Sequence, residues 1–140
     1  MKLFRNALIS AVVVLGVGCA SLDADRVPAE FATGSEVFHV KKFGPDERRI
    51  DRVIADELSA MGLRASYGVD VPEAEEFDVL VTYSDRWQWD MTMYMRELNI
   101  QFREPGNRRM VARGRSQRDS LTRLPPDEMA REILHEMLGR

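Results

Sequence analysis

Two amphipathic segments, one in the first half of the chain and one at its end, constrain the fold more than any other feature. Gly44-Pro45-Asp46-Glu47 opens the first and Pro126-Asp127-Glu128 opens the second. Proline suits the first helical turn, where its missing N–H is not needed, and carboxylates there face the positive end of the helix dipole. Each segment predicts a helix with one apolar stripe to bury, and Gly62 followed by Leu63 predicts that the first ends in a Schellman cap. The stripes consist of Ile50, Val53, Ile54, Leu58 and Met61 in the first segment and of Met129, Ala130, Ile133, Leu134, Met137 and Leu138 in the second.

The sequence before and between these helices predicts strands. Val37–Phe43 alternates loosely between apolar and polar residues, and Phe77–Tyr83 is apolar on both sides, which is typical of a central strand. Thr92–Arg103 and Arg109–Gln117 are joined by the turn Glu104-Pro105-Gly106-Asn107 and predict an antiparallel hairpin. With a right-handed crossover between the first two strands, the order β-α-β-β-β-α predicts an α+β two-layer sandwich. It has a four-stranded mixed sheet with both helices on one face.

Length and composition bound the chain to one modest domain. The 140 residues are 44% hydrophobic and 31% charged, which supports one packed core and excludes a larger multidomain enzyme or a disordered chain. Residues 36–140 hold the predicted domain, and Ala65–Val71 is a further candidate for a short edge strand. The preceding residues 19–35, which include Pro28 and Gly34 and show no sustained period, predict a flexible tether.

The first 18 residues have the order of a secretory signal. Two basic residues, Lys2 and Arg5, precede an apolar run from Ala7 to Val17, and small residues follow. The run is shorter than the roughly 20 residues that a membrane-spanning helix needs, so removal of residues 1–18 is favoured over a permanent membrane helix. Loss of the two basic residues changes the formal net charge from −3 to −5, which gives no reason to expect binding to nucleic acid.

Cys19 is the only cysteine, so the chain cannot form an intramolecular disulfide. The segment Val14-Leu15-Gly16-Val17-Gly18-Cys19 resembles the lipobox of bacterial lipoproteins, with Gly16 standing where that family prefers a branched apolar residue. The resemblance implies that Cys19 becomes the first residue of the mature chain and carries diacylglycerol and an amide-linked acyl chain. It also implies, through Ala20, export to the outer membrane with the domain facing the periplasm. Alternatively, Cys19 is an unmodified small residue at the end of a signal peptide that is cut elsewhere.

The most distinctive segment is Asp85–Arg96, with the sequence DRWQWDMTMYMR. Its alternate residues from Trp87 to Met95 are all tryptophan or methionine, so a continuous strand would gather them into one apolar stripe. Tryptophan offers a large contact area and methionine repacks easily, which favours a surface for a ligand or partner; the alternative is a stripe buried under the helices. Leu98, Ile100 and Phe102 have the opposite parity, so a bulge or turn must intervene if all are core. The candidate binding residues are Trp87, Trp89, Asp90, Met93 and Tyr94.

The same segment, together with Ser120-Leu121-Thr122-Arg123, resembles part of a group of small uncharacterised bacterial outer-membrane lipoproteins. The similarity runs from Phe77 to Met137 and implies a fold and an envelope location, but no activity. The order of strands and helices is also similar to that of the lipoprotein subunit of the lipopolysaccharide-assembly complex. That likeness is one of fold and implies no site residues.

Arginines crowd the last predicted hairpin and the loop after it. Strand alternation puts Arg109, Arg113 and Arg115 on one face of the sheet. Arginine binds phosphate and carboxylate through paired N–H donors, so these three are candidate anion-binding residues, with lipid or lipopolysaccharide as the ligand. The alternative is a solvated sheet face whose arginines pair with the acidic connector Pro72–Glu76.

The chain contains no arrangement of residues that defines a catalytic or metal site. His39 and His135 lack both a cysteine partner and the HxxxH or HExxH spacing of a metal site. Asp85 and Asp90 form a carboxylate pair without supporting context, which leaves an envelope hydrolase as the weakest hypothesis. We therefore expect a non-catalytic binding or assembly module of the cell envelope, without a cofactor. A lipid anchor would attach it to the membrane, and its partner would be an envelope protein or lipid.

The alternative function is binding of lipid or lipopolysaccharide through the arginine face. The sequence does not indicate an oligomeric state.

Overall fold

The computed structural model describes residues 18–140. All of the predicted signal sequence except Gly18 therefore lies outside the described residues. Within residues 18–140, no helix has the length and apolar character needed to cross a membrane.

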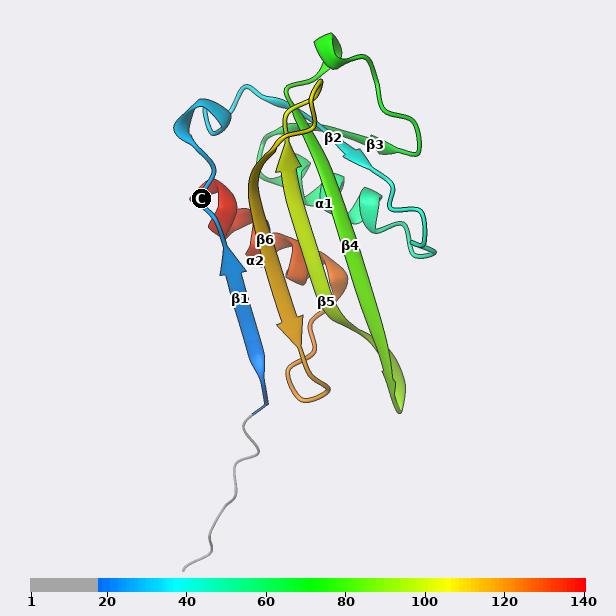
Figure 1. Cartoon of the computed structure of the whole chain (residues 1–140). Coiled ribbons are helices and arrows are strands. Elements are labelled where there is room, and N and C mark those ends of the chain that lie inside the picture. Colours follow the sequence, from blue (N-terminus) through cyan, green and yellow to red (C-terminus); the bar gives the residue numbers. More distant parts are fainter. Residues whose placement is uncertain (1–17) are drawn as a thin grey trace, which may run out of the picture.

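The described residues form one six-stranded mixed sheet with two α-helices packed on one of its faces (Figure 1). The strands are β1 Ala20–Ala24, β2 Val37–Lys41, β3 Arg64–Gly68, β4 Val79–Asp90, β5 Thr92–Arg103 and β6 Met110–Arg118. The helices are α1 Ile50–Ala60 and α2 Pro126–Leu138, with short 3-10 helices at Ala29–Phe31 and Ala74–Glu76. The strand order is β1-β6-β5-β4-β2-β3. β4, β5 and β6 form an antiparallel meander, β1 adds antiparallel to β6, and β2 runs parallel to both β3 and β4.

The predicted α+β class, with both helices on one face, is confirmed, but the sheet has six strands instead of four. One added strand is β3, which pairs with β2 over most of the segment considered as a short edge strand. The other is β1, which occupies the start of the predicted tether, residues 19–35, and corrects that prediction. β1 pairs with β6 from Ala20↔Arg118 to Ala24↔Gly114. Five residues without a clear period form a strand here because the open edge of β6 supplies their hydrogen-bonding partners.

The chain after β1 is also fixed to the domain. Val27 is buried, and its N–H donates to the carbonyl of Met137 at 2.8 Å. The remainder of the predicted tether therefore passes over the end of α2 before it enters β2 (Figure 1).

Both predicted apolar stripes are buried between the helices and the sheet. Ile54 and Leu58 of α1 and Ile133 and Leu134 of α2 are fully inaccessible to solvent and belong to the same core cluster. Across the sheet, the rings of Phe38 and Phe102 pack with centroids 5.4 Å apart.

The predicted Schellman cap of α1 is confirmed. Gly62 has a left-handed φ of 82°, and the N–H of Leu63 donates to the Leu58 carbonyl at 3.1 Å. This geometry satisfies carbonyls that the helix end leaves without partners.

The start of α1 differs from the prediction, because the helix begins at Ile50 instead of Pro45. The carboxylate of Asp46 accepts the N–H groups of Arg48 and Ile50, both at 2.7 Å, and the Tyr83 hydroxyl at 2.5 Å. Asp46 thus holds a turn ahead of the helix and ties it to β4. Burial by itself would raise the pKa of Asp46, but these hydrogen bonds outweigh it and leave the pKa below its usual value.

Gly114 of β6 lies beneath α2, where a β-carbon would come within 2.5 Å of Ile133 Cγ2 and 3.0 Å of Met137 Sδ. We predict that Gly114→Ala lowers the free energy of unfolding by about 1–3 kcal/mol, the usual cost of overpacking a core. Gly106→Ala in the β5–β6 turn is the matched control, because nothing lies within 4 Å of its β-carbon position. Urea unfolding followed by circular dichroism measures both variants. Equal stability of the two would contradict the packing of α2 on β6.

Candidate functional site at the Cys19 end

Three segments that are far apart in the sequence meet at one end of the molecule (Figure 1). The first is Cys19, which leads into β1. The second is the tip of the β4–β5 hairpin at residues 89–93, and the third is residues 119–123 of the loop between β6 and α2. We call this region the Cys19 end. Cys19, Tyr94 and Asp119 line one depression of about 330 Å³ there. The fold thus brings the residue predicted to be lipidated beside the segment predicted to bind a partner.

Cys19 is held to the domain through its backbone, while its side chain remains exposed. Its N–H donates to Asp119 Oδ2 at 2.5 Å, and its carbonyl accepts the Thr122 hydroxyl at 3.1 Å. The hydrogen bond from the Cys19 N–H is the main reason that the pKa of Asp119 lies below its usual value. Sequence reasoning missed this contact, because a hundred residues separate the two partners.

The segment Asp85–Arg96, which carries the stripe of Trp and Met residues, forms the distal half of the β4–β5 hairpin. The expected bulge lies between Arg86 and Trp87. Beyond the bulge, Trp87 pairs with Met95 and Trp89 pairs with Met93. Met91 forms the turn with a left-handed φ of 62°. The stripe is therefore buried only in part, because the hairpin extends past the end of the helical layer (Figure 1).

The inner residues of the stripe pack within the domain. Met95 is buried, and Trp87 is half-buried against the core. Its Nε1–H donates to Asp85 Oδ2 at 2.6 Å, and the Arg48 guanidinium lies 4.0 Å from its ring centre. Tyr94, another candidate binding residue, has the opposite parity and is also buried.

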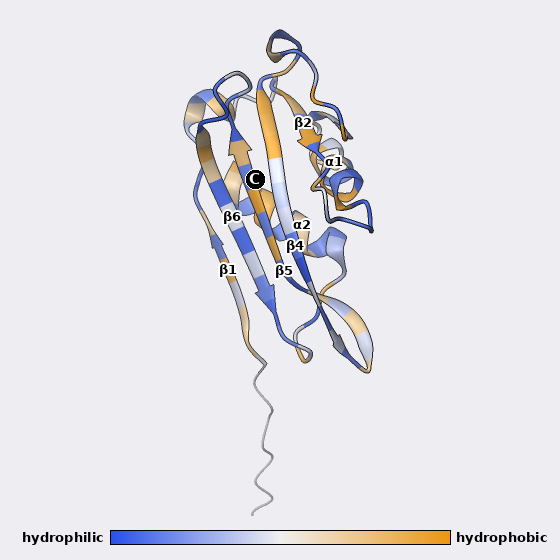
Figure 2. Ribbon diagram, turned by 45° about the vertical axis from the view of Figure 1, so that its right-hand side comes forward, coloured by the Kyte–Doolittle hydropathy of each residue, from blue (hydrophilic) through white to orange (hydrophobic). Residues whose placement is uncertain are grey.

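The outer part of the stripe is exposed. The exposed fractions are 68% for Trp89, 87% for Met91 and 44% for Met93, and Asp90 between them is exposed as well. Leu121 in the neighbouring loop is 71% exposed. Figure 2 shows pale orange residues near this hairpin tip, which projects away from the rest of the sheet. Of the predicted binding residues, Trp89, Asp90 and Met93 thus remain available to a partner.

Arg123 fixes the hairpin tip to the loop. Its Nη2 donates to the Asp90 carbonyl at 2.7 Å, its Nη1 donates to the Thr92 hydroxyl at 2.5 Å, and its guanidinium lies 4.7 Å from the Tyr94 ring centre. Sequence reasoning placed Arg123 among many arginines and assigned it no role. The clamp holds the exposed tip in a fixed position relative to Cys19.

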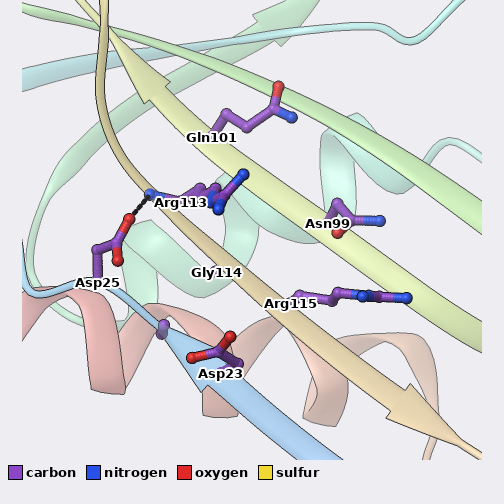
Figure 3. Close-up of a pocket in the computed structure, with 8 residues that line it drawn as sticks. Asp23, Asp25, Asn99, Gln101, Arg113, Gly114 and Arg115 are labelled. Atoms are coloured by element: carbon purple, nitrogen blue, oxygen red, sulfur yellow. Dashed lines mark hydrogen bonds between the residues drawn. The ribbon is translucent and has the colours of Figure 1, made fainter.

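The three candidate anion-binding arginines do not form one free cluster. Arg109 pairs with Glu104 at 2.8 Å in the β5–β6 turn, and Arg115 pairs with Glu97 at 2.9 Å on the open face of the sheet. Arg113 and Arg115 line a shallow depression of about 240 Å³ together with Asp23 and Asp25 (Figure 3). The carboxylates near these arginines are Glu97 of β5, Glu104 of the turn, Asp23 of β1 and Asp25 just after it. None of them belongs to the acidic connector Pro72–Glu76.

Glu97 is the centre of the polar network on this open face. Its carboxylate accepts Arg115 at 2.9 Å, Gln117 at 3.0 Å and Asn99 at 2.6 Å, and its side chain is only 9% exposed. Burial by itself would raise the pKa of Glu97, but the hydrogen bonds from these neighbours outweigh it and lower the pKa. Two of the three candidate arginines are thus paired with carboxylates of the domain.

The remaining candidate chemical groups are also bonded within the fold. His39 is buried, its Nδ1 lies 2.8 Å from the Ser66 hydroxyl, and burial lowers its pKa. Nδ1 of His135 lies 2.6 Å from the Arg140 carbonyl. Among residues 18–140, no group of three or more His, Cys, Asp or Glu side chains is arranged to hold a metal ion.

No protein-family model matches the chain, and no curated protein sequence is significantly similar to it. Solved structures do share its fold. The PelC dodecamer from Paraburkholderia phytofirmans aligns with a TM-score of 0.59 at 15% identity, over 86% of this chain and 95% of that chain. A PelC variant dodecamer from the same organism aligns with the same TM-score and identity, over 86% and 96%. This likeness supports the α+β fold alone.

We predict that Glu97→Gln lowers the free energy of unfolding by about 1.5–3 kcal/mol, the usual range for hydrogen bonds to a charged group. Because the pKa of Glu97 is lowered by folding, its stabilising effect is present above the unfolded-state pKa of about 4.3 and is lost as the pH falls through the folded-state pKa. The parent protein should therefore lose more stability on acidification than Glu97→Gln does.

Urea unfolding at neutral and at acidic pH measures this difference. Glu104→Gln is the matched control, because its ion pair with Arg109 lies in an exposed turn and contributes little. Parallel acid profiles for the parent and Glu97→Gln would contradict the assignment.

Proposed function

We propose that the protein is a lipid-anchored, non-catalytic binding or assembly module of the bacterial cell envelope, held at the outer membrane with its domain facing the periplasm. The observation that carries the proposal is the position of Cys19. This residue ends a lipobox-like segment, is exposed, and lies one residue before β1. A residue whose attached lipid enters a bilayer has to be exposed in this way.

The anchor defines how such a module works. Diacylglycerol together with an amide-linked acyl chain meets the requirement of more than one lipid signal for stable attachment. Confinement to the membrane plane raises the effective concentration of the domain near other envelope components. Binding then needs only modest contact surfaces on the domain itself.

Two kinds of surface are available for such contacts. One is the exposed hairpin tip with Trp89 and Met93. The other consists of the two outer edges of the sheet, at β1 and at β3, where each strand pairs with a single neighbour. An unpaired strand edge presents N–H and C=O groups that can pair with a strand of another chain.

Self-association is the form of assembly that we favour. The PelC structures that share this fold are dodecamers, and the free edge of β1 offers a surface for a second copy. Leu22 of β1 is 39% exposed, so the edge is not purely polar.

Binding of lipid or lipopolysaccharide through Arg109, Arg113 and Arg115 has weaker support. An anion would have to compete with Glu97 for Arg115 and with Glu104 for Arg109. An envelope hydrolase has the least support, because Asp85 accepts the Trp87 Nε1–H and Asp90 lies exposed at the end of β4.

We predict that the intact mass of the protein purified from cell envelopes equals that of residues 19–140 plus diacylglycerol and one acyl chain. Cys19→Ala should remain unprocessed, because it lacks the thiol that is lipidated before cleavage. Mass spectrometry of both proteins measures the difference. An unmodified Cys19 thiol, or a retained leader in the parent protein, would overturn the proposed anchor.

We also predict that the purified protein is a homo-oligomer whose formation depends on the edge of β1. Leu22→Lys should reduce the number of copies, because an edge lysine disfavours strand pairing between molecules. Val69→Lys is the matched control, since Val69 is 69% exposed and lies beyond the opposite edge strand. Native mass spectrometry in detergent counts the copies, and a monomeric parent protein would contradict self-association.

A further inference from the structure

We propose that the tip of the β4–β5 hairpin inserts into the lipid–water interface beside the anchor, so that the ligand of this surface is the phospholipid bilayer itself. The inference rests on the proposed lipid at Cys19 and names the partner of the hairpin. The inserting side chains are Trp89, Met91 and Met93 of the hairpin and Leu121 of the loop.

The first argument is the absence of a spacer. A tether over residues 19–35 would hold the domain clear of the membrane, but β1 begins at Ala20. Both the N–H and the carbonyl of Cys19 are bonded to the loop, through Asp119 and Thr122. A lipid attached to Cys19 is therefore separated from the folded domain by little more than one side chain. The bilayer surface must then lie against the Cys19 end.

The second argument is the rigid connection between the anchor and the hairpin. The loop that holds Cys19 also carries Arg123, which donates to the Asp90 carbonyl and to the Thr92 hydroxyl. The depression that Cys19 lines is also lined by Gln88 and Tyr94 of the hairpin. A bilayer that meets Cys19 consequently meets the hairpin tip as well (Figure 1).

The third argument is the chemistry of the tip. Tryptophan prefers the headgroup level of a bilayer, where its apolar ring and polar N–H are both accommodated, and methionine adapts its shape to irregular surroundings. Met91 has a φ of 62°, at which glycine or asparagine costs less than a long apolar side chain. An 87% exposed methionine at that position has no packing role in the domain, so its value to the protein lies in contact with something else.

The arginines of the Cys19 end have partners within the domain. Arg118 pairs with Glu132, and Arg123 lies 3.9 Å from Asp90. Arg96 donates to the side chain of Gln88. Because Arg118 and Arg123 are matched by carboxylates of the domain, the proposed contact is carried mainly by apolar surface, and it should form on zwitterionic lipid and persist in salt.

The test uses the protein as it is purified from envelopes, reconstituted into phosphatidylcholine vesicles that contain a nitroxide-labelled lipid. Trp87 and Trp89 are the two tryptophans of the chain, so Trp87→Phe leaves Trp89 as the reporter. Trp89→Phe leaves the half-buried Trp87 as the matched control. We expect the nitroxide-labelled lipid to reduce Trp89 emission roughly twofold, since interfacial side chains lie about 5–10 Å deep in the bilayer. It should reduce Trp87 emission much less.

A second variant separates insertion from folding. Met91→Asn suits the left-handed backbone and keeps the turn, so it should unfold at the same or a higher urea concentration than the parent. In the Trp87→Phe background it should nevertheless reduce quenching of Trp89, because the tip loses apolar contact. Unchanged quenching in a folded Met91→Asn protein would contradict a role for the tip residue.

The outcomes distinguish the hairpin from the anchor. An acylated protein whose Trp89 is no more quenched than Trp87 overturns the hairpin proposal and leaves the anchor standing. Trp89 emission that is blue-shifted without lipid quenching also overturns it, because the tip is then covered by protein. If the mass shows no lipid, the anchor fails, and quenching of Trp89 by the added vesicles still supports the hairpin on its own.

Discussion

The pairing of β1 with β6 is the contact on which the arrangement of this protein depends. Five residues at the start of the described chain complete the sheet, and the residue before them is bonded to the loop that follows β6. Neither contact buries much apolar surface, but together they remove the freedom that a linker would have given the chain end. Cys19 thereby becomes a fixed point of the fold, and the hairpin held by Arg123 lies at the same end.

The elements that could be predicted from the sequence are those that carry their own periodicity. α2 begins at Pro126 as predicted, and the strand Thr92–Arg103 matches β5, because both are long and strongly patterned. The sequence does not predict β1, since a short edge strand is decided by a partner that is distant in sequence. The start of α1 was misplaced because Asp46 bonds two N–H groups locally and ends the turn before the helix begins. That preference is not visible in the spacing of apolar residues.

The candidate site shows the same division. Periodicity identified the Trp/Met stripe and the need for a bulge, but it could not tell where the helical layer ends, which decides that Trp87 is partly covered and Trp89 is exposed. Strand alternation predicts that Arg113 and Arg115 share one face of the sheet, but it leaves open which face that is. The partner of Arg115, Glu97, is on the neighbouring strand, so it could be found only once the register of β5 against β6 was known.

The length of the central hairpin has a consequence for what the domain can reach. β4 and β5 each contain 12 residues, which at about 3.3 Å per residue span roughly 40 Å. The turn between β5 and β6 and the acidic connector before β4 lie at the end of the molecule opposite the end that we propose contacts a membrane (Figure 1). The sheet then acts as a spacer of set height. Any component that recognises those distal loops would be positioned about four nanometres from the lipid surface.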